Sequence, residues 1–378
     1  MKTSHILYLL FSWFLPVLVL AQPQFSINTY SGYTNNAFYN HNQYPDYYTW
    51  INGYANYDRI GDQGGLRLYY DGSATLYNQY QDKNYQLHTL GLSFYHYYHD
   101  EQIRLNAGTS LGSRQHSDAY QWYEMNTLNA YANTKIVLAN QLFGYSGMDI
   151  DYNYYPNLDP FTHLQTRLYL RLSRFFDTGT TLIAESSLMS KFYKSEGDAA
   201  AIEGFPEIIT VGDNNSQQLL LQFKAAQGLT PKTGLSGGVT LRHNLTNSTR
   251  YLGSVSGYYY SDEEILNDVF GYHSTEYDLK FKQLLPWKST LSVGGSVMFR
   301  DYENRLALDI AGNPFPDFRT RQDDRYSLWL TLQKQLRLAS SMAPLTLTFG
   351  FTNIENQSND LYYDYHVRNI SFSIDQAF

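Results

Sequence analysis

Three features of the sequence predict an all-β fold, namely a transmembrane antiparallel up-and-down β-barrel of about sixteen strands, with roughly 14–18 possible. Apolar and polar residues alternate with a period of two in one segment after another. Short and long connections alternate between these segments. After residue 21, no apolar run approaches the roughly 18 residues that a membrane-spanning helix requires.

The first 21 residues predict a secretory signal peptide. Lys2 is followed by an apolar run from Ile6 to Leu20, and Val19 and Ala21 occupy the two positions that a signal peptidase reads. Cleavage after Ala21 would leave residues 22–378 as a single barrel domain that begins its first strand almost at once. Loss of Lys2 would change the formal net charge from -8 to -9.

The composition narrows the class of protein further. Tyrosine accounts for 37 of 378 residues and aromatic residues for 17%, while the mean hydropathy is -0.44. Such tyrosine enrichment suits the aromatic girdles of membrane barrels. The absence of cysteine excludes disulfides, thiolate metal sites and a cysteine nucleophile. The acidic balance argues against a nucleic-acid partner, and we expect no cofactor.

Period-two alternation defines the strands of the first half of the chain. In the segment His163–Arg174, Leu168 and Leu170 share one face. Arg167 and Arg171 share the other. We assign the leucines to lipid and the polar residues to the interior. The predicted strands of this half are Phe25–Thr34, Tyr47–Asp58, Leu66–Leu76, Leu90–Tyr95, Ile103–Leu111, Met125–Leu138, Leu142–Tyr154 and His163–Arg174.

The second half continues the pattern and adds long connections. The loops Lys194–Asn215, Asn247–His273 and Glu303–Thr320 all follow odd-numbered strands, whereas the even-numbered strands are followed by short turns. Short periplasmic turns and longer outer loops are typical of a membrane barrel. A soluble jelly roll or propeller, the alternative all-β fold, would not place its long loops on one phase. The predicted strands are Thr181–Tyr193, Gln217–Ala225, Leu235–Arg242, Thr275–Leu285, Leu291–Phe299, Tyr326–Leu332, Leu345–Phe351 and Ile370–Phe378.

The last nine residues carry a resemblance to a known class of proteins. Ile370, Phe372 and Ile374 alternate with polar residues, and Phe378 ends the chain on the same apolar parity, with Gln376 as the one departure. This ending resembles the closing strand of Gram-negative, porin-like outer-membrane β-barrel proteins. The resemblance implies a bacterial outer-membrane location, contact with membrane lipid and lipopolysaccharide, and recognition of these four apolar residues by the barrel-assembly machinery.

Charges on two adjacent inward faces are the candidate functional residues. Asp149 and Asp151 lie on one predicted strand, and Arg167 and Arg171 lie on the next. This opposition resembles the acidic and basic ladders that shape the internal field of a channel. A structural belt of salt bridges is an equal alternative. We expect a passive channel for small hydrophilic solutes or ions, in which the net negative charge favours small cations.

Other clusters offer different functions. His99 with Asp100 and Glu101, and His116 with Asp118, are the compact candidates for a hydrolase at the barrel rim, but no nucleophile motif accompanies them. We therefore expect that the protein is not an enzyme. Two further sets of residues indicate ligand binding only weakly. They are an acidic loop with calcium-binding residue types, Asp262, Glu263, Glu264 and Asp268, and inward tyrosines able to stack on sugar rings, Tyr69, Tyr77, Tyr95, Tyr145 and Tyr169.

A basic cluster supports an alternative role. Arg319, Arg321, Asp323 and Arg325 are expected at the outer end of a strand, where they would solvate a loop base or meet lipopolysaccharide phosphates or an anionic solute. The run from Arg321 to Tyr326, together with Asn356, Ser358 and Asn359 before Asp364 and Tyr365, also resembles the closing region of surface-lipoprotein and exopolysaccharide export barrels. That resemblance implies a structural, assembly or export-partner barrel.

Overall fold

The chain folds as a barrel, and this confirms the predicted fold class. The computed structural model describes residues 23–99, 101–194, 208–246, 248–252, 268–337 and 343–378, so the predicted signal peptide lies outside the described residues. These residues form a closed antiparallel barrel of sixteen strands and a separate two-stranded sheet. The barrel strands are β1 (Gln24–Thr34), β2 (Asp46–Gly61), β3 (Gly64–Tyr77), β4 (Tyr85–Tyr98), β5 (Ile103–His116), β6 (Met125–Ala139), β7 (Leu142–Tyr154), β8 (His163–Phe175), β9 (Thr180–Tyr193), β11 (Asn215–Thr230), β12 (Thr233–Asn244), β14 (His273–Leu285), β15 (Ser289–Leu306), β16 (Thr320–Leu336), β17 (Leu345–Ser358) and β18 (Tyr365–Ala377).

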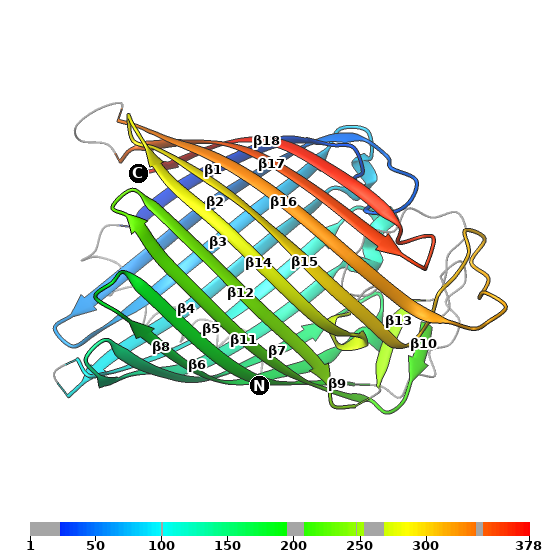
Figure 1. The fold of residues 1–378 in the computed structure, drawn as a ribbon, viewed down its shortest axis with the longest axis horizontal. Helices are drawn as coiled ribbons and strands as arrows, with labels where there is room; N and C mark the ends of the chain where they lie inside the picture. The colour runs from blue at the N-terminus through cyan, green and yellow to red at the C-terminus, as the bar shows by residue number, and fades with distance from the viewer. Residues whose placement is uncertain (1–22, 100, 195–207, 247, 253–267, 338–342) are drawn as a thin grey trace, which may run out of the picture.

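The two ends of the barrel differ in their connections. We call the end with the connections after β1, β3, β5, β7, β9, β12, β15 and β17 the loop end, and the opposite end the turn end. Figure 1 shows the turn end at the left with the carboxy terminus, and the loop end at the right. The loop end carries the two-stranded sheet of β10 (Ile208–Val211) and β13 (Thr249–Leu252), together with short 3₁₀ helices. The long connections therefore lie on one phase, as the sequence predicts.

The last strand closes the barrel. β18 pairs with β17 on one side and with β1 on the other, in a register that runs from Ser26 opposite Ala377 to Thr34 opposite Asn369. The amide of Phe378 donates a hydrogen bond to the carbonyl of Phe25 at 2.8 Å. Closure leaves no row of unpaired peptide groups along an open edge, which hydrocarbon would not tolerate.

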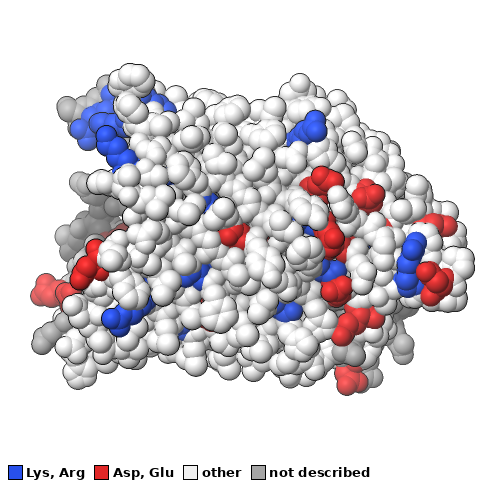
Figure 2. Space-filling view, in the orientation of Figure 1, with Lys and Arg blue, Asp and Glu red and all other residues white. Residues whose placement is uncertain are grey.

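The outer surface is apolar across the middle of the barrel. Leu168 and Leu170 are 50% and 67% exposed on the isolated chain, as expected for side chains that face lipid. Ile370, Phe372, Ile374 and Phe378 are exposed as well, at 41% to 69%. Gln376 breaks the pattern near the turn end, where its amide donates to the carbonyl of Ala343 at 3.1 Å. Figure 2 shows charged side chains gathered toward the two ends, with a largely uncharged span between them.

Buried apolar side chains gather at the loop end rather than in the middle of the barrel. Each belongs to a loop-end connection or to the strand end beside one, and each is at most 5% exposed: Phe38, Tyr123, Tyr155, Leu158, Phe161, Phe270, Tyr302 and Tyr363. Among the described residues, no helix is long and apolar enough to span a membrane.

The strands extend further toward the loop end than the sequence predicts. β15 continues to Leu306 and β16 begins at Thr320, whereas the apolar alternation covers only Leu291–Phe299 and Tyr326–Leu332. These extensions carry polar residues on both faces, so hydrophobic periodicity does not reveal them. β10 and β13 lie within connections that the sequence analysis treats as loops.

Replacing Leu170 tests the outward assignment. Leu170→Arg places a charge near the bilayer midplane, and we expect a loss of about 2–4 kcal/mol in folding free energy. Ser327→Arg is the matched control, because Ser327 lies between the outward Tyr326 and Leu328 and therefore faces the interior. Refolding titrations into lipid vesicles measure both variants. Equal effects of the two substitutions would contradict the assignment.

Deleting Phe378 tests the proposed assembly signal. The deletion removes an exposed aromatic side chain and the last backbone hydrogen bond between β18 and β1. We expect a reduced amount of protein in the outer membrane, while Phe378→Tyr, which keeps the ring, restores it. Membrane fractionation and heat-modifiable electrophoretic mobility provide the measurement. Normal assembly of the truncated chain would show that Phe378 is not part of the signal.

Candidate functional site: the barrel lumen

The predicted charge ladder lies on the inner wall, as the sequence indicates. Register places Asp149 opposite Arg167, with one residue on β7 and the other on β8. Arg167 Nη1 lies 3.7 Å from Asp149 Oδ2. Asp151 instead accepts a hydrogen bond from the amide of Asn129 on β6 at 2.7 Å. The structure thus brings one predicted acidic and basic pair together and gives Asp151 a neutral partner.

A carboxylate that the sequence analysis missed lies at the centre of this cluster. Glu185 on β9 is opposite Arg171 in register, and its side chain is only 3% exposed. Arg171 donates to Glu185 Oε2 at 2.6 Å, and Arg167 donates to Oε1. Ser187 donates to the same carboxylate at 3.2 Å. Glu185 lies on the inward parity of a predicted strand, so aligning it with the preceding strand would have revealed this partner.

We call Asp149, Asp151, Arg167, Arg171 and Glu185 the charge belt. It holds two guanidinium groups against three carboxylates, so its formal charge is negative. The arginine side chains retain 32% and 39% of their exposure although they face the interior. Because charged groups avoid dry apolar surroundings, this exposure indicates that water reaches the wall.

The wall formed by β11, β12, β14, β15 and β16 bounds a hollow of about 660 Å³. Small side chains such as Ser236 and Ser296 line it and leave space in the lumen. Lys224, Asp278 and Lys280 also line it, which places charges of both signs beside the space. Glu276, Asp278 and Lys280 alternate along β14, and all three border this hollow.

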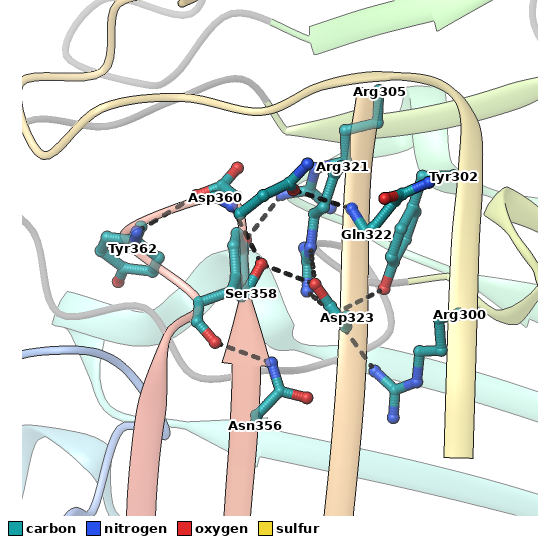
Figure 3. A network of polar contacts seen from close by, with 12 residues as sticks. Arg300, Tyr302, Arg305, Arg321, Gln322, Asp323, Asn356, Ser358, Asp360 and Tyr362 are labelled. Atoms are coloured by element: carbon teal, nitrogen blue, oxygen red, sulfur yellow. Dashed lines mark hydrogen bonds and ion pairs between the residues drawn. The ribbon is translucent and has the colours of Figure 1, made fainter. Parts of the chain in front are cut away.

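A buried ionic network lies at the loop end. Figure 3 shows Asp323 beside the guanidinium groups of Arg321 and Arg300. Arg321 Nη2 lies 2.5 Å from Asp323 Oδ2, and Arg321 Nε donates to Oδ1 at 2.9 Å. Ser358 on β17 also donates to this carboxylate, at 2.6 Å. The side chains of Arg321 and Asp323 are 1% and 0% exposed, so the pair is sealed from solvent.

Aromatic rings enclose this network. The guanidinium carbon of Arg321 lies 4.4 Å from the ring centroid of Tyr302 and 3.6 Å from that of Tyr363. Arg305 donates to the hydroxyl of Tyr363 at 2.7 Å. In the adjoining loop, burial raises the pKa of Asp360 above its ordinary value, although Arg321 and Arg305 oppose that shift. The network therefore ties the β15, β16 and β17 ends to the last loop.

This geometry corrects the expectation for the basic cluster. Arg321 faces inward and is buried, so it does not solvate a loop base and does not face lipid. Only Arg319 is exposed, and it lies 3.9 Å from Asp317. The sequence could not show the burial, because the covering tyrosines come from β15 and from the loop before β18.

The candidate catalytic residues do not form a catalytic arrangement in the described residues. His99 lies in the turn between β4 and β5, and Asp100 lies outside the described residues. The ring of His116 stacks near Tyr85 and Tyr123, with centroid distances of 5.2 and 5.7 Å. Neither ring nitrogen of His116 has a hydrogen-bond partner, so no carboxylate orients it as a base.

The acidic loop proposed for calcium is largely undescribed. Residues 262–264 lie outside the described residues, while Asp268 is buried and lies 2.7 Å from the ammonium of Lys191. In the described part of the chain, no group of three or more His, Cys, Asp or Glu side chains is placed to hold a metal ion.

Comparison with known proteins finds similarity in fold. No family model matches the chain, and no curated protein matches it. Solved structures from Pseudomonas aeruginosa do match. OpdL is 12% identical with a TM-score of 0.53, covering 95% of this chain and 99% of its own. The outer membrane protein OpdK is 12% identical with a TM-score of 0.51, covering 94% and 99%. OprD is 9% identical with a TM-score of 0.51, covering 94% and 95%. The chain therefore shares the barrel fold of these proteins over nearly its whole length.

Proposed function

We propose that this protein is an outer-membrane β-barrel that acts as a passive channel for small hydrophilic solutes and ions. The observation that carries the proposal is the solvent exposure of charged side chains inside the closed barrel. Arg171 faces the interior and still retains 39% of its side-chain exposure. A hollow of about 660 Å³ with lysine and aspartate on its wall also supports a water-filled lumen. A sealed structural barrel would be expected to fill this space with side chains.

The location follows from the fold and from the two surfaces of the barrel. The apolar outer band suits lipid, and the fold is similar to that of the outer membrane protein OpdK. The turn end would face the periplasm and the loop end the outside. Near the loop end the outward surface becomes polar. There His273 Nε2 lies 2.6 Å from Glu303 Oε1, and Arg368 is exposed. Such groups suit lipopolysaccharide headgroups better than acyl chains.

The export-partner alternative loses its main support. It rests on the run from Arg321 to Tyr326 and on the segment from Asn356 to Tyr365. In the structure, Arg321, Asp323 and Ser358 belong to a buried network that holds the loop end together. That role explains the residues without a partner polypeptide. No other described cluster favours an export role, so the channel is the function that the geometry supports best.

The charge belt is proposed to set ion selectivity. Three carboxylates face two guanidinium groups, and a negative wall concentrates cations in a narrow aqueous space. Small cations should therefore pass somewhat better than anions. Glu185 holds both arginines and is nearly inaccessible, so Asp149 and Asp151 are the acidic groups that ions would meet.

Neutralising those two aspartates tests the proposal. Asp149→Asn with Asp151→Asn should shift the reversal potential toward anions in planar bilayers while single-channel conductance persists. The shift should shrink in concentrated salt, because the screening length falls to about 3 Å at 1 M. The matched control is Asp301→Asn with Glu355→Gln, which removes the same charge from the outward face near the loop end.

Two results would contradict the proposal. If the purified wild-type barrel shows no conductance, the channel function fails and a sealed structural or export-partner barrel is the better account. If the outward control shifts the reversal potential as much as the lumen variant, the selectivity does not arise from the charge belt.

A further inference from the structure

A second cavity lies on the inner wall close to the loop end. It measures about 360 Å³ and is bounded by β1 to β4, by the loop after β1 and by Asn369 of β18. Six aromatic side chains line it, none of them fully buried: Tyr30, Tyr39, Tyr48, Trp50, Tyr77 and Tyr85. We call this cavity the aromatic pocket. Its volume is within the range of about 300–1,000 Å³ that is usual for small-molecule sites.

Strand register gathers these rings. On β2, Tyr47 and Ile51 are outward and exposed, which turns Tyr48 and Trp50 inward. Trp50 is opposite Tyr30 of β1, and Tyr48 is opposite Tyr77 of β3. The aromatic residues are thus fixed side by side on rigid strands, and only Tyr39 comes from the loop.

The rings form a continuous platform. The centroids of Tyr30 and Tyr48 are 5.7 Å apart with planes at 35°, and those of Tyr48 and Tyr77 are 6.0 Å apart at 34°. A hydrogen bond of 3.0 Å joins the hydroxyls of Tyr30 and Tyr48. A Cβ at Gly32 would lie 3.0 Å from the ring of Tyr48. Glycine therefore allows this ring to lie flat against the wall, with its other face toward the lumen.

The polar groups of the pocket are neutral. Hydroxyls of Thr34 and Thr75 join those of the tyrosines, and no charged side chain is among the lining residues. The ammonium nitrogen of Lys83 lies 5.1 Å from the centroid of the Tyr77 ring, but Lys83 is buried, donates to the carbonyl of Ala37 and does not line the pocket. A charged solute would therefore lose hydration in the pocket without gaining an opposite charge.

One polar atom in the pocket lacks a partner. The amide nitrogen of Asn369 donates to the hydroxyl of Tyr39 at 3.4 Å, whereas its Oδ1 is buried and accepts no hydrogen bond. Because this oxygen has almost no exposed surface, a solute in the pocket would meet the hydroxyl and amide groups around it rather than the oxygen itself.

We propose that the aromatic pocket binds a neutral pyranose saccharide. A pyranose ring presents C–H groups on its faces, which pack on aromatic rings, and hydroxyls at its edge, which match the tyrosine, threonine and asparagine groups. A cationic ligand would also stack on aromatic faces, but it would find no carboxylate in this lining. The inference deepens the proposed channel function by naming a solute class, and it rests on that function only in requiring a lumen that solutes can enter.

Calorimetry on the folded, detergent-solubilised barrel tests the site without requiring conductance. The probes are neutral glucose, galactose and mannose oligosaccharides, with choline as the cationic comparison. We expect millimolar binding of at least one neutral saccharide and no binding of choline. Trp50→Ala removes a stacking face and should weaken saccharide binding about tenfold, which matches the upper range of aromatic contact energies.

Two further variants keep the test decisive. Tyr30→Phe retains the ring and the fold but removes a hydroxyl, so it should weaken binding less than Trp50→Ala. Trp329→Ala removes an inward tryptophan on β16, four strands around the barrel from Trp50 on β2 and outside the pocket lining, and should leave saccharide binding unchanged. Heat-modifiable mobility verifies that each variant is folded.

The outcomes separate the pocket from the channel. Saccharide binding by a barrel that does not conduct would leave the pocket standing and refute the channel. A conducting barrel that binds none of the neutral saccharides would refute the pocket alone. Choline binding that Trp50→Ala abolishes, without saccharide binding, would identify a cation site and overturn the proposal. Equal losses in Trp50→Ala and Trp329→Ala would also overturn it.

Discussion

The need to pair every backbone peptide group within the barrel is the constraint on which the rest of this structure depends. Hydrocarbon offers no hydrogen-bond partner, so an open edge would leave a row of amides unsatisfied. β18 removes both edges at once by pairing with β1 and with β17. Closure then divides the side chains of every strand between lipid and lumen. That division explains why one period-two pattern recurs along the whole chain.

Closure also limits how side chains can fill the interior. The strands fix the position of each Cα atom on the wall, so only the length and direction of the inward side chains can vary. Large inward rings lie over small neighbours on adjacent strands. A Cβ at Gly91 would lie 2.2 Å from the ring of Tyr69, and a Cβ at Gly294 would lie 2.5 Å from Trp329. Rings that lie along the wall occupy little of the lumen. The tyrosine content is thus compatible with an open interior, and in the aromatic pocket it provides the faces on which we propose that a saccharide stacks.

The fold could be predicted from the sequence because its governing pattern is local. Alternation within a segment reveals a strand, and the phase of the long connections reveals the orientation. The candidate site was harder to predict from the sequence, because its contacts join neighbouring strands whose register the sequence does not state. Arg167 and Asp149 are paired as expected, but Glu185, which binds both arginines, becomes evident only when β8 and β9 are aligned. The burial of Arg321 depends on Tyr302 and Tyr363, which come from other elements. β10 and β13 lack apolar alternation long enough to detect.

Charged side chains inside the barrel occur in two environments. The arginines of the charge belt are partly exposed to solvent, whereas the charged side chains of the loop-end network are buried. In the charge belt the arginine side chains are 32% and 39% exposed, so water screens their interactions and a change of charge alters the local field more than the stability. At the loop end Arg321 and Asp323 are almost fully buried. Removing one partner of such a pair typically costs about 3–5 kcal/mol, because the other charge is left without compensation. The loop end is thus held in a defined shape, whereas in the proposed channel the charge belt would remain free to act on ions. The aromatic pocket stands on rigid strands and borders the lumen, so in the proposed channel it would offer solutes a weak and reversible site.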